Sequence, residues 1–453
     1  MDNYDFYQLL DDYSWFFICL ILSSGLIHFL VFKKFISTLF DPYLLSVVAS
    51  VFSVADVALL YISNNISFYL FSSFILTQIS FWLGLYSISI ANTYGNLLSP
   101  YKKIYNTNLN TTKKEITFYF FSIVFILSQT AIYILKGIPL FMASRLDTFA
   151  EGTGEGVLGR LTDVTSIFVL YYFLDTVDLK LPKITDLPKW LVMIFLFLSL
   201  LLSGSKSSFL ITFSVFWCYM VYSSMNGIDI SYFLNIFKKH YKKILVVSLI
   251  LVSGIIIGQN SKDDEISSTI NPLLSLGMRF IHSGDVYWYA YPNNIYLTID
   301  GEPSFKALFL DAFGLLRIYE YKELPQAIGI TLKDIHHPSD TVSGPNARHN
   351  VFGLIYFGFF GSIIFSYLLG VIISFLRNIL PRTLKYSSLN GFIFTYLVIK
   401  LSLLDTDPML GFTYVNNILI VFPILYIINM FITDTLIAIT SKEITSEAEI
   451  INV

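Results

Sequence analysis

The sequence contains few charged residues. Of its 453 residues, 13% are Asp, Glu, Lys or Arg, whereas 55% are hydrophobic and 17% are aromatic. A soluble domain uses about 25% charged residues to cover its surface, so this composition excludes a soluble globular protein. The net charge of −3 provides no basic face, because the lysines stand at the ends of apolar runs. Nucleic-acid binding is therefore excluded as well.

The sequence also lacks the features of a disulfide framework and of a cleaved leader. It has two cysteines, Cys19 and Cys218, and both lie inside apolar runs, so neither a disulfide nor a thiolate metal site is expected. The first residues are acidic, and the apolar run that follows has no small-residue cleavage site. We expect this first run to remain as a membrane anchor.

Long apolar runs occupy most of the chain instead. Each can cross a bilayer core of about 30 Å at about 1.5 Å per residue. The pattern predicts an all-α polytopic membrane protein with about 11 transmembrane helices, and the range is 10–12 because two runs are short. The predicted spans are 14–32, 43–62, 66–90, 116–135, 157–177, 189–203, 208–224, 244–258, 351–376, 388–404 and 411–432. The short runs 189–203 and 208–224 form either two spans or one re-entrant hairpin.

Lysine and arginine concentrate in every second connector, as after the first run at Lys33 and Lys34. Because cytoplasmic loops carry this excess, the N-terminus is predicted outside and the C-terminus in the cytoplasm. One long outer loop is rich in aromatics and leucine, which predicts a folded cap with short helices. The chain then divides into an N-terminal transmembrane bundle (1–258), the loop (259–350), C-terminal transmembrane helices (351–432) and a cytoplasmic tail (433–453).

Basic side chains gather on the predicted outer face. Arginine presents a planar fork that matches phosphate oxygens, and lysine presents a point charge. The pattern predicts a site for a negatively charged ligand at headgroup depth. Simple anchoring of these side chains at the membrane interface is the alternative. The candidates are Arg145, Arg160, Lys206, Arg279 and Arg348.

Two of these arginines have histidine or aspartate close in sequence. His349 follows Arg348, and His282 and Asp285 follow Arg279. Because a histidine with a pKa near 6.5 accepts a hydroxyl proton at neutral pH, His349 is the first candidate for a general base. Asp285 and His282 are further candidates, and a plain interfacial histidine is the alternative.

Other chemistry has less support in the sequence. The adjacent histidines 336 and 337 point apart, and no nearby carboxylate completes a metal site, so neither a metal nor a cofactor is expected. The intramembrane charges Asp56, Asp163 and Lys400 are few and form no relay along one span. A proton-coupled transporter usually has more.

Four short stretches stand out on the outer face. They are Gly137-Ile-Pro-Leu-Phe141 before Arg145, Leu202-Ser-Gly-Ser-Lys206, Arg279 with Gly284-Asp285, and His349-Asn350 before Gly358-Phe-Phe-Gly361. Together with the many spans and the single large outer loop, they resemble the Wzy-type O-antigen polymerases, the oligosaccharide repeat unit polymerase family. The last stretch also resembles the loop-end His-Asn of the related O-antigen ligases.

The resemblance implies a GT-C-like fold in the bacterial inner membrane, with a large periplasmic loop. It implies metal-independent transfer of a glycan from undecaprenyl pyrophosphate to the hydroxyl of a lipid-linked repeat unit. The five basic residues would hold pyrophosphate, and His349, Asp285 or His282 would take the acceptor proton. A chain-length regulator and the repeat-unit flippase are the implied partners. An O-antigen ligase, another periplasmic lipid-linked-sugar glycosyltransferase, and a lipid-linked oligosaccharide flippase or transporter are the alternatives.

Overall fold

The computed structural model describes most of the chain. The described residues are 1–88, 111–142, 156–177, 183–204, 208–228, 235, 239, 243, 272–299, 301, 304–320, 323–338 and 344–451. Within them the chain is helical and contains no strand. Nine of the described helices are long and apolar enough to cross a membrane. The protein is therefore a helical, multi-pass membrane protein.

The helices follow one another with short connections in the described parts of the chain. The long helices are α2 (Ser14–Phe32), α3 (Leu44–Ile62), α4 (Phe68–Ser87), α5 (Thr111–Lys136), α6 (Gly156–Thr176), α7 (Leu187–Leu202), α8 (Ser208–Met225), α15 (His349–Asn378), α17 (Ser388–Leu401) and α19 (Phe422–Ile451). The short ones are α1 (Asn3–Asp12), α10 (Pro272–Ile281), η5 (His282–Gly284), α11 (Asp285–Ala290), η6 (Pro292–Thr298), α12 (Ser304–Leu308), α13 (Leu310–Leu315), α14 (Ile328–His336), α16 (Leu380–Thr383), η8 (Ser402–Asp405), α18 (Pro408–Asn416) and the π-helical turn η9 (Asn417–Val421).

Each predicted span that falls in the described residues corresponds to a helix. The helix at 208–224 is α8, whose apolar part, Leu210–Met225, is shorter than the nine candidate spans. The predicted span 244–258 lies outside the described residues. The last helix, α19, continues to Ile451, past the predicted end of its span at residue 432.

Local sequence sets where several helices begin. The Ser387 hydroxyl accepts a hydrogen bond from the Asn390 backbone N–H at 3.0 Å, and the Asp407 carboxylate accepts one from Leu410 at 3.0 Å. Pro408 follows Asp407 at the first helical position, where its missing N–H costs nothing. These caps satisfy backbone groups that lipid cannot hydrogen-bond.

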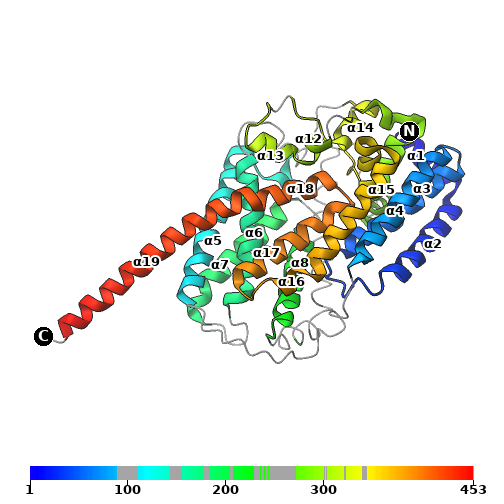
Figure 1. Ribbon diagram of the computed structural model, residues 1–453. Helices are drawn as coiled ribbons and strands as arrows, with labels where there is room; N and C mark the ends of the chain where they lie inside the picture. Colours follow the sequence, from blue (N-terminus) through cyan, green and yellow to red (C-terminus); the bar gives the residue numbers. More distant parts are fainter. Residues whose placement is uncertain are drawn as a thin grey trace.

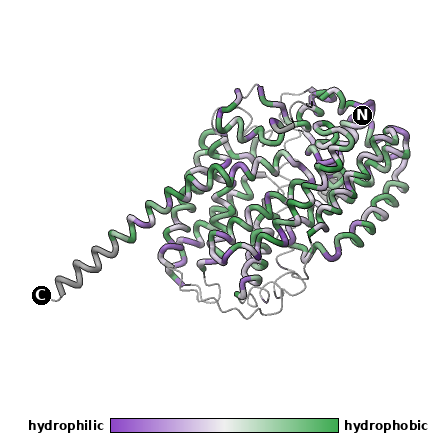
Figure 2. Tube along the Cα trace, viewed as in Figure 1, coloured by the Kyte–Doolittle hydropathy of each residue, from purple (hydrophilic) through white to green (hydrophobic). Residues whose placement is uncertain are grey.

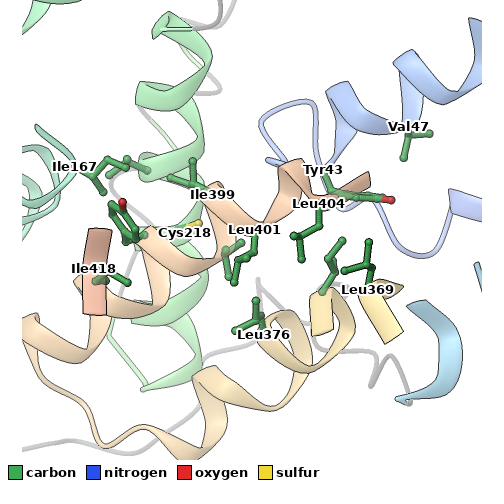
Figure 3. Close-up of a cluster of buried hydrophobic side chains, with 14 of the residues drawn as sticks. Tyr43, Val47, Ile167, Cys218, Leu369, Leu376, Ile399, Leu401, Leu404 and Ile418 are labelled. Atoms are coloured by element: carbon green, nitrogen blue, oxygen red, sulfur yellow. The ribbon is translucent and has the colours of Figure 1, made fainter. Parts of the chain in front are cut away.

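The bundle packs around a continuous apolar core. Hydrophobic residues run along the bundle helices (Figure 2). Figure 3 shows part of the core, where Val47 of α3, Ile167 of α6, Cys218 of α8, Leu369 of α15 and Leu401 of α17 contribute side chains. All five are less than 10% exposed, so helices from both halves of the sequence form one packed unit.

Short helices cover one end of the bundle. Helices α12, α13 and α14 lie at the end that also carries the N-terminus, and α16 lies toward the opposite end (Figure 1). We call the described residues 272–338 the cap. The described part of the predicted outer loop, 259–350, thus contains several short helices.

Helix α15 differs from the single straight span predicted at 351–376. At Gly358 the backbone has φ +66° and ψ −172°, a conformation open to glycine but not to a helix. His349 Nδ1 lies 2.9 Å from Ser366 Oγ, 17 residues further on, whereas a straight helix would separate them by about 26 Å. Residues 349–357 therefore fold back along the longer limb, 359–378, as a helical hairpin.

Candidate functional site

The hairpin carries Arg348 into the interior of the bundle. The Arg348 guanidinium donates to both Asp405 oxygens, at 3.2 and 3.3 Å, and to the Ser53 hydroxyl at 2.9 Å. The Ser46 hydroxyl donates to the other side of the same carboxylate. The Arg348 and Asp405 side chains are each 1% exposed. A buried pair of this kind is stable only when its remaining hydrogen-bonding positions are also filled, as they are here for Asp405.

His349 lies beside this ion pair and is closed to solvent. Its Nε2 lies 3.3 Å from Asp405 Oδ1, and its Nδ1 lies 2.9 Å from Ser366 Oγ. Phe81 stacks on the ring with centroids 4.7 Å apart, and the side chain is 0% exposed. We call Arg348, His349, Asp405, Ser46 and Ser53 the Arg348 cluster.

The cluster lies level with the middle of the neighbouring helices. The Asn350 amide donates to Thr77 Oγ1 at 2.8 Å and its oxygen accepts from the Tyr287 hydroxyl at 2.6 Å. Thr77 is the tenth of the 20 residues of α4. Arg348 and His349 were expected at the outer rim, where a loop meets a span. They lie deeper because the chain enters the bundle before residues 349–357 turn back toward the cap.

A second polar group lies next to the cluster, where η5 meets α11. His282 Nδ1 is 3.9 Å from Asp285 Oδ2, and the two side chains are 31% and 20% exposed. The Tyr7 hydroxyl of α1 is hydrogen-bonded to His282 Nε2. We call His282 and Asp285 the His282 pair, which is the more accessible of the two groups.

The backbone between the pair connects it to the Arg348 cluster. The Ser283 carbonyl accepts from the Ser53 hydroxyl at 3.1 Å and from Arg348 at 3.4 Å. Gly284 packs against Asp56 of α3 so closely that an added Cβ would lie 2.0 Å from a carboxylate oxygen. Only glycine fits there. Asp56 is the thirteenth of the 19 residues of α3, so the pair lies in the half of α3 nearer the cap.

The surroundings of the pair set its protonation. Burial raises the pKa of Asp285 to about 7, although the Val286 backbone N–H, Arg348 and Arg279 favour its ionised form. Burial and the nearby Arg279 charge lower the pKa of His282. Near neutral pH, His282 is therefore an unprotonated imidazole beside a carboxyl group that titrates in the same range.

The other basic residues predicted from the sequence do not gather at one site in the described part of the chain. Arg279 is exposed on α10 and lies close enough to act electrostatically on the His282 pair. Arg160 of α6 instead forms a two-pronged ion pair with Asp311 of α13, including a 2.6 Å contact, with both side chains less than 20% exposed. Arg145 and Lys206 lie outside the described residues.

Sequence reasoning missed several partners. Asp405 directly follows the predicted span 388–404, where an acidic residue with no neighbouring base indicates a distant arginine. Nothing in the sequence connects Tyr7 with His282. The intramembrane charges Asp163 and Lys400, for which the sequence indicates no relay along one span, form an ion pair between two helices, α6 and α17. The Tyr396 hydroxyl donates to the same carboxylate.

The aromatic run that begins α11 is an apolar support for the site. Tyr287, Trp288 and Tyr291 are each at most 1% exposed. Their burial makes them part of the packed core of the cap. Within the described residues, no group of three or more His, Cys, Asp or Glu side chains could hold a metal ion.

Comparison with known proteins gives no relative: no protein-family model matches the sequence, and no curated protein or solved structure is significantly similar to the chain.

Proposed function

We propose that the protein is a Wzy-type polymerase that joins undecaprenyl-pyrophosphate-linked O-antigen repeat units at the periplasmic face of the bacterial inner membrane. The observation that carries this proposal is the His282 pair. The partly exposed His282 imidazole lies 3.9 Å from the Asp285 carboxyl group. The buried Arg348–Asp405 ion pair lies next to this pair, within a multi-pass membrane protein. An imidazole base beside a carboxyl group that orients it is an arrangement that activates a hydroxyl group.

The proposed reaction transfers a glycan without a metal. The bond between the donor's anomeric carbon and the pyrophosphate oxygen breaks, and a bond to the acceptor oxygen forms. The acceptor proton passes to the His282 pair. The departing pyrophosphate gains negative charge, which a fixed guanidinium stabilises. Arg279 is the exposed arginine beside the pair.

The remaining candidates take other roles in this proposal. Arg348 positions the Ser283 carbonyl and thereby the pair on either side of it. His349 is enclosed by Phe81, Ser366 and Asp405, so we assign the proton transfer to the His282 pair and orientation of Asp405 to His349. Arg145, Arg160 and Lys206 are further pyrophosphate ligands, and Arg160 must then exchange Asp311 for phosphate.

Transport of lipid-linked oligosaccharides is the second candidate. The Asp163–Lys400 pair favours it, because ionisable groups inside the bundle often mark a transport route. A ligase that transfers finished glycan to lipid A-core would use the same His282 pair, so the site alone does not separate it from a polymerase.

The lipopolysaccharide ladder of a deletion strain separates these functions. Loss of a polymerase leaves lipopolysaccharide that carries a single repeat unit. Loss of a ligase leaves free lipid-linked polymer, and loss of a flippase leaves single units on the cytoplasmic side. An unchanged ladder would overturn the proposed polymerisation.

A further inference from the structure

The N-terminal helix α1 lies against the His282 pair and leaves part of it exposed. Phe6 stacks on Trp288 with ring centroids 3.9 Å apart, and Trp288 Nε1 donates to Asn3 Oδ1 at 3.0 Å. Phe6 is the only buried residue of α1. Tyr7, Leu9 and Leu10 pack on the core only in part. A short helix with so little buried surface separates from its support at low cost.

Tyr7 places a hydroxyl group on the catalytic candidate. Its O–H group is hydrogen-bonded to His282 Nε2, and the two rings meet edge-on with centroids 5.7 Å apart. Burial and the Asp285 charge raise the pKa of Tyr7 to about 12, so the phenol stays protonated and donates. Nε2 is then the accepting nitrogen, and Nδ1 carries the hydrogen that faces Asp285.

We infer that His282 Nε2 marks the subsite for the acceptor hydroxyl and that Tyr7 fills this subsite until a lipid-linked sugar displaces it. The inference rests on the proposed function and names the atom that receives the acceptor proton. A sugar hydroxyl and the Tyr7 hydroxyl are both neutral donors, so each makes the same hydrogen bond to Nε2. Two hydroxyl groups cannot occupy that position together.

The exchange defines an order of events. The acceptor hydroxyl replaces the Tyr7 hydroxyl and donates to Nε2. As the acceptor oxygen bonds to the anomeric carbon and the pyrophosphate leaves, the hydroxyl proton moves to Nε2 and Asp285 stabilises the imidazolium. The imidazolium then releases the proton to solvent, and Tyr7 returns. Without acceptor, the occupied subsite keeps water from Nε2 and limits hydrolysis of the donor.

The first test measures access to Nε2 with no substrate present. Diethyl pyrocarbonate acylates unprotonated imidazole nitrogen, and mass spectrometry reports the extent at His282 in the purified full-length protein. Tyr7→Phe removes the hydroxyl and keeps the ring, and we expect acylation about threefold to tenfold faster, the ratio that corresponds to one hydrogen bond. Phe6→Ala should give an equal or larger increase by releasing α1.

Tyr4→Phe is the matched control, because Tyr4 lies on the same helix and is 75% exposed. Its His282 acylation rate should equal that of the wild type. Equal rates in the wild type, Tyr7→Phe and Phe6→Ala proteins, with melting temperatures maintained, would overturn the inference.

The second test uses the acceptor class itself. Lipid-linked single repeat units, purified from the deletion strain, should slow acylation of His282 in the Tyr7→Phe protein at least as strongly as Tyr7 does in the wild type. Faster acylation that these units fail to slow would overturn the acceptor assignment. An unchanged ladder in the deletion strain would overturn polymerisation instead, so the two failures are distinguishable.

Discussion

The Arg348 cluster and the His282 pair are neighbours that differ in their access to a ligand. In sequence they look alike, since each combines an arginine with a histidine at the predicted outer face. In the structure Arg348 and His349 are at most 1% exposed and face Asp405, whereas His282 is 31% exposed. We therefore propose a supporting role for the first group and a chemical role for the second.

Replacing the two histidines separates these roles most strongly. His282→Gln should reduce the rate of polymerisation by about 10²–10⁴-fold, the usual cost of losing a general base, with little change in protein stability. His349→Gln should reduce the melting temperature in detergent more than His282→Gln does. Initial rates with purified lipid-linked repeat units and thermal unfolding measure both. An active His282→Gln protein would reverse the assignment.

The buried arginine should dominate stability. Arg348→Ala leaves the Asp405 carboxylate buried and unpaired, which costs about 3–5 kcal/mol. Arg348→Met combined with Asp405→Leu removes both charges and should recover much of that loss. Lys34→Ala, at an exposed cation just after α2, is the control and should leave unfolding unchanged. Unfolding of Arg348→Ala at the wild-type temperature would contradict the closed, supporting character of the cluster.

The exposed arginine should affect catalysis more than stability. Arg279→Ala removes a charge-assisted hydrogen bond to pyrophosphate, which costs about 1.5–3 kcal/mol, or roughly tenfold to a hundredfold in rate. Arg279→Lys should recover little if both guanidinium nitrogens contact phosphate. Kinetics at saturating acceptor measure this effect. Wild-type rates for both variants would make Arg279 an interfacial anchor.

The pH dependence should follow the carboxyl group of the pair. Because burial raises the pKa of Asp285 to about 7, the group is protonated below that pH and stabilises no imidazolium there. The rate should rise about tenfold per unit as pH increases toward 7 and level off above it. A rate that is constant between about pH 5.5 and pH 8 would show that this carboxyl group takes no part.

The long helices were predictable because an apolar run of 19 or 20 residues needs little else to become a transmembrane helix. The hairpin in α15 was not, because Gly358 lies in an uninterrupted apolar stretch and glycine is common in membrane helices. Its presence follows from packing: Gly353 lies close against Ser362 of the second limb.

The candidate site was predictable in its residue types but not in its contacts. Arg348 and Asp405 are separated by 57 residues, and Tyr7 and His282 by 275. Periodicity and local spacing contain no information about such pairs. The sequence also ranked His349 above His282, because adjacency to arginine is visible in a sequence and burial by Phe81 is not.

The most direct test of the account is the chain-length distribution of polysaccharide made by Asp285→Asn in the deletion strain. The change removes the negative charge and keeps the side-chain shape, and Asp12→Asn, at an exposed position of α1, is its control. At matched expression we predict single-repeat product from Asp285→Asn and a full ladder from Asp12→Asn. A full ladder from Asp285→Asn would contradict the assignment of the chemistry to the His282 pair.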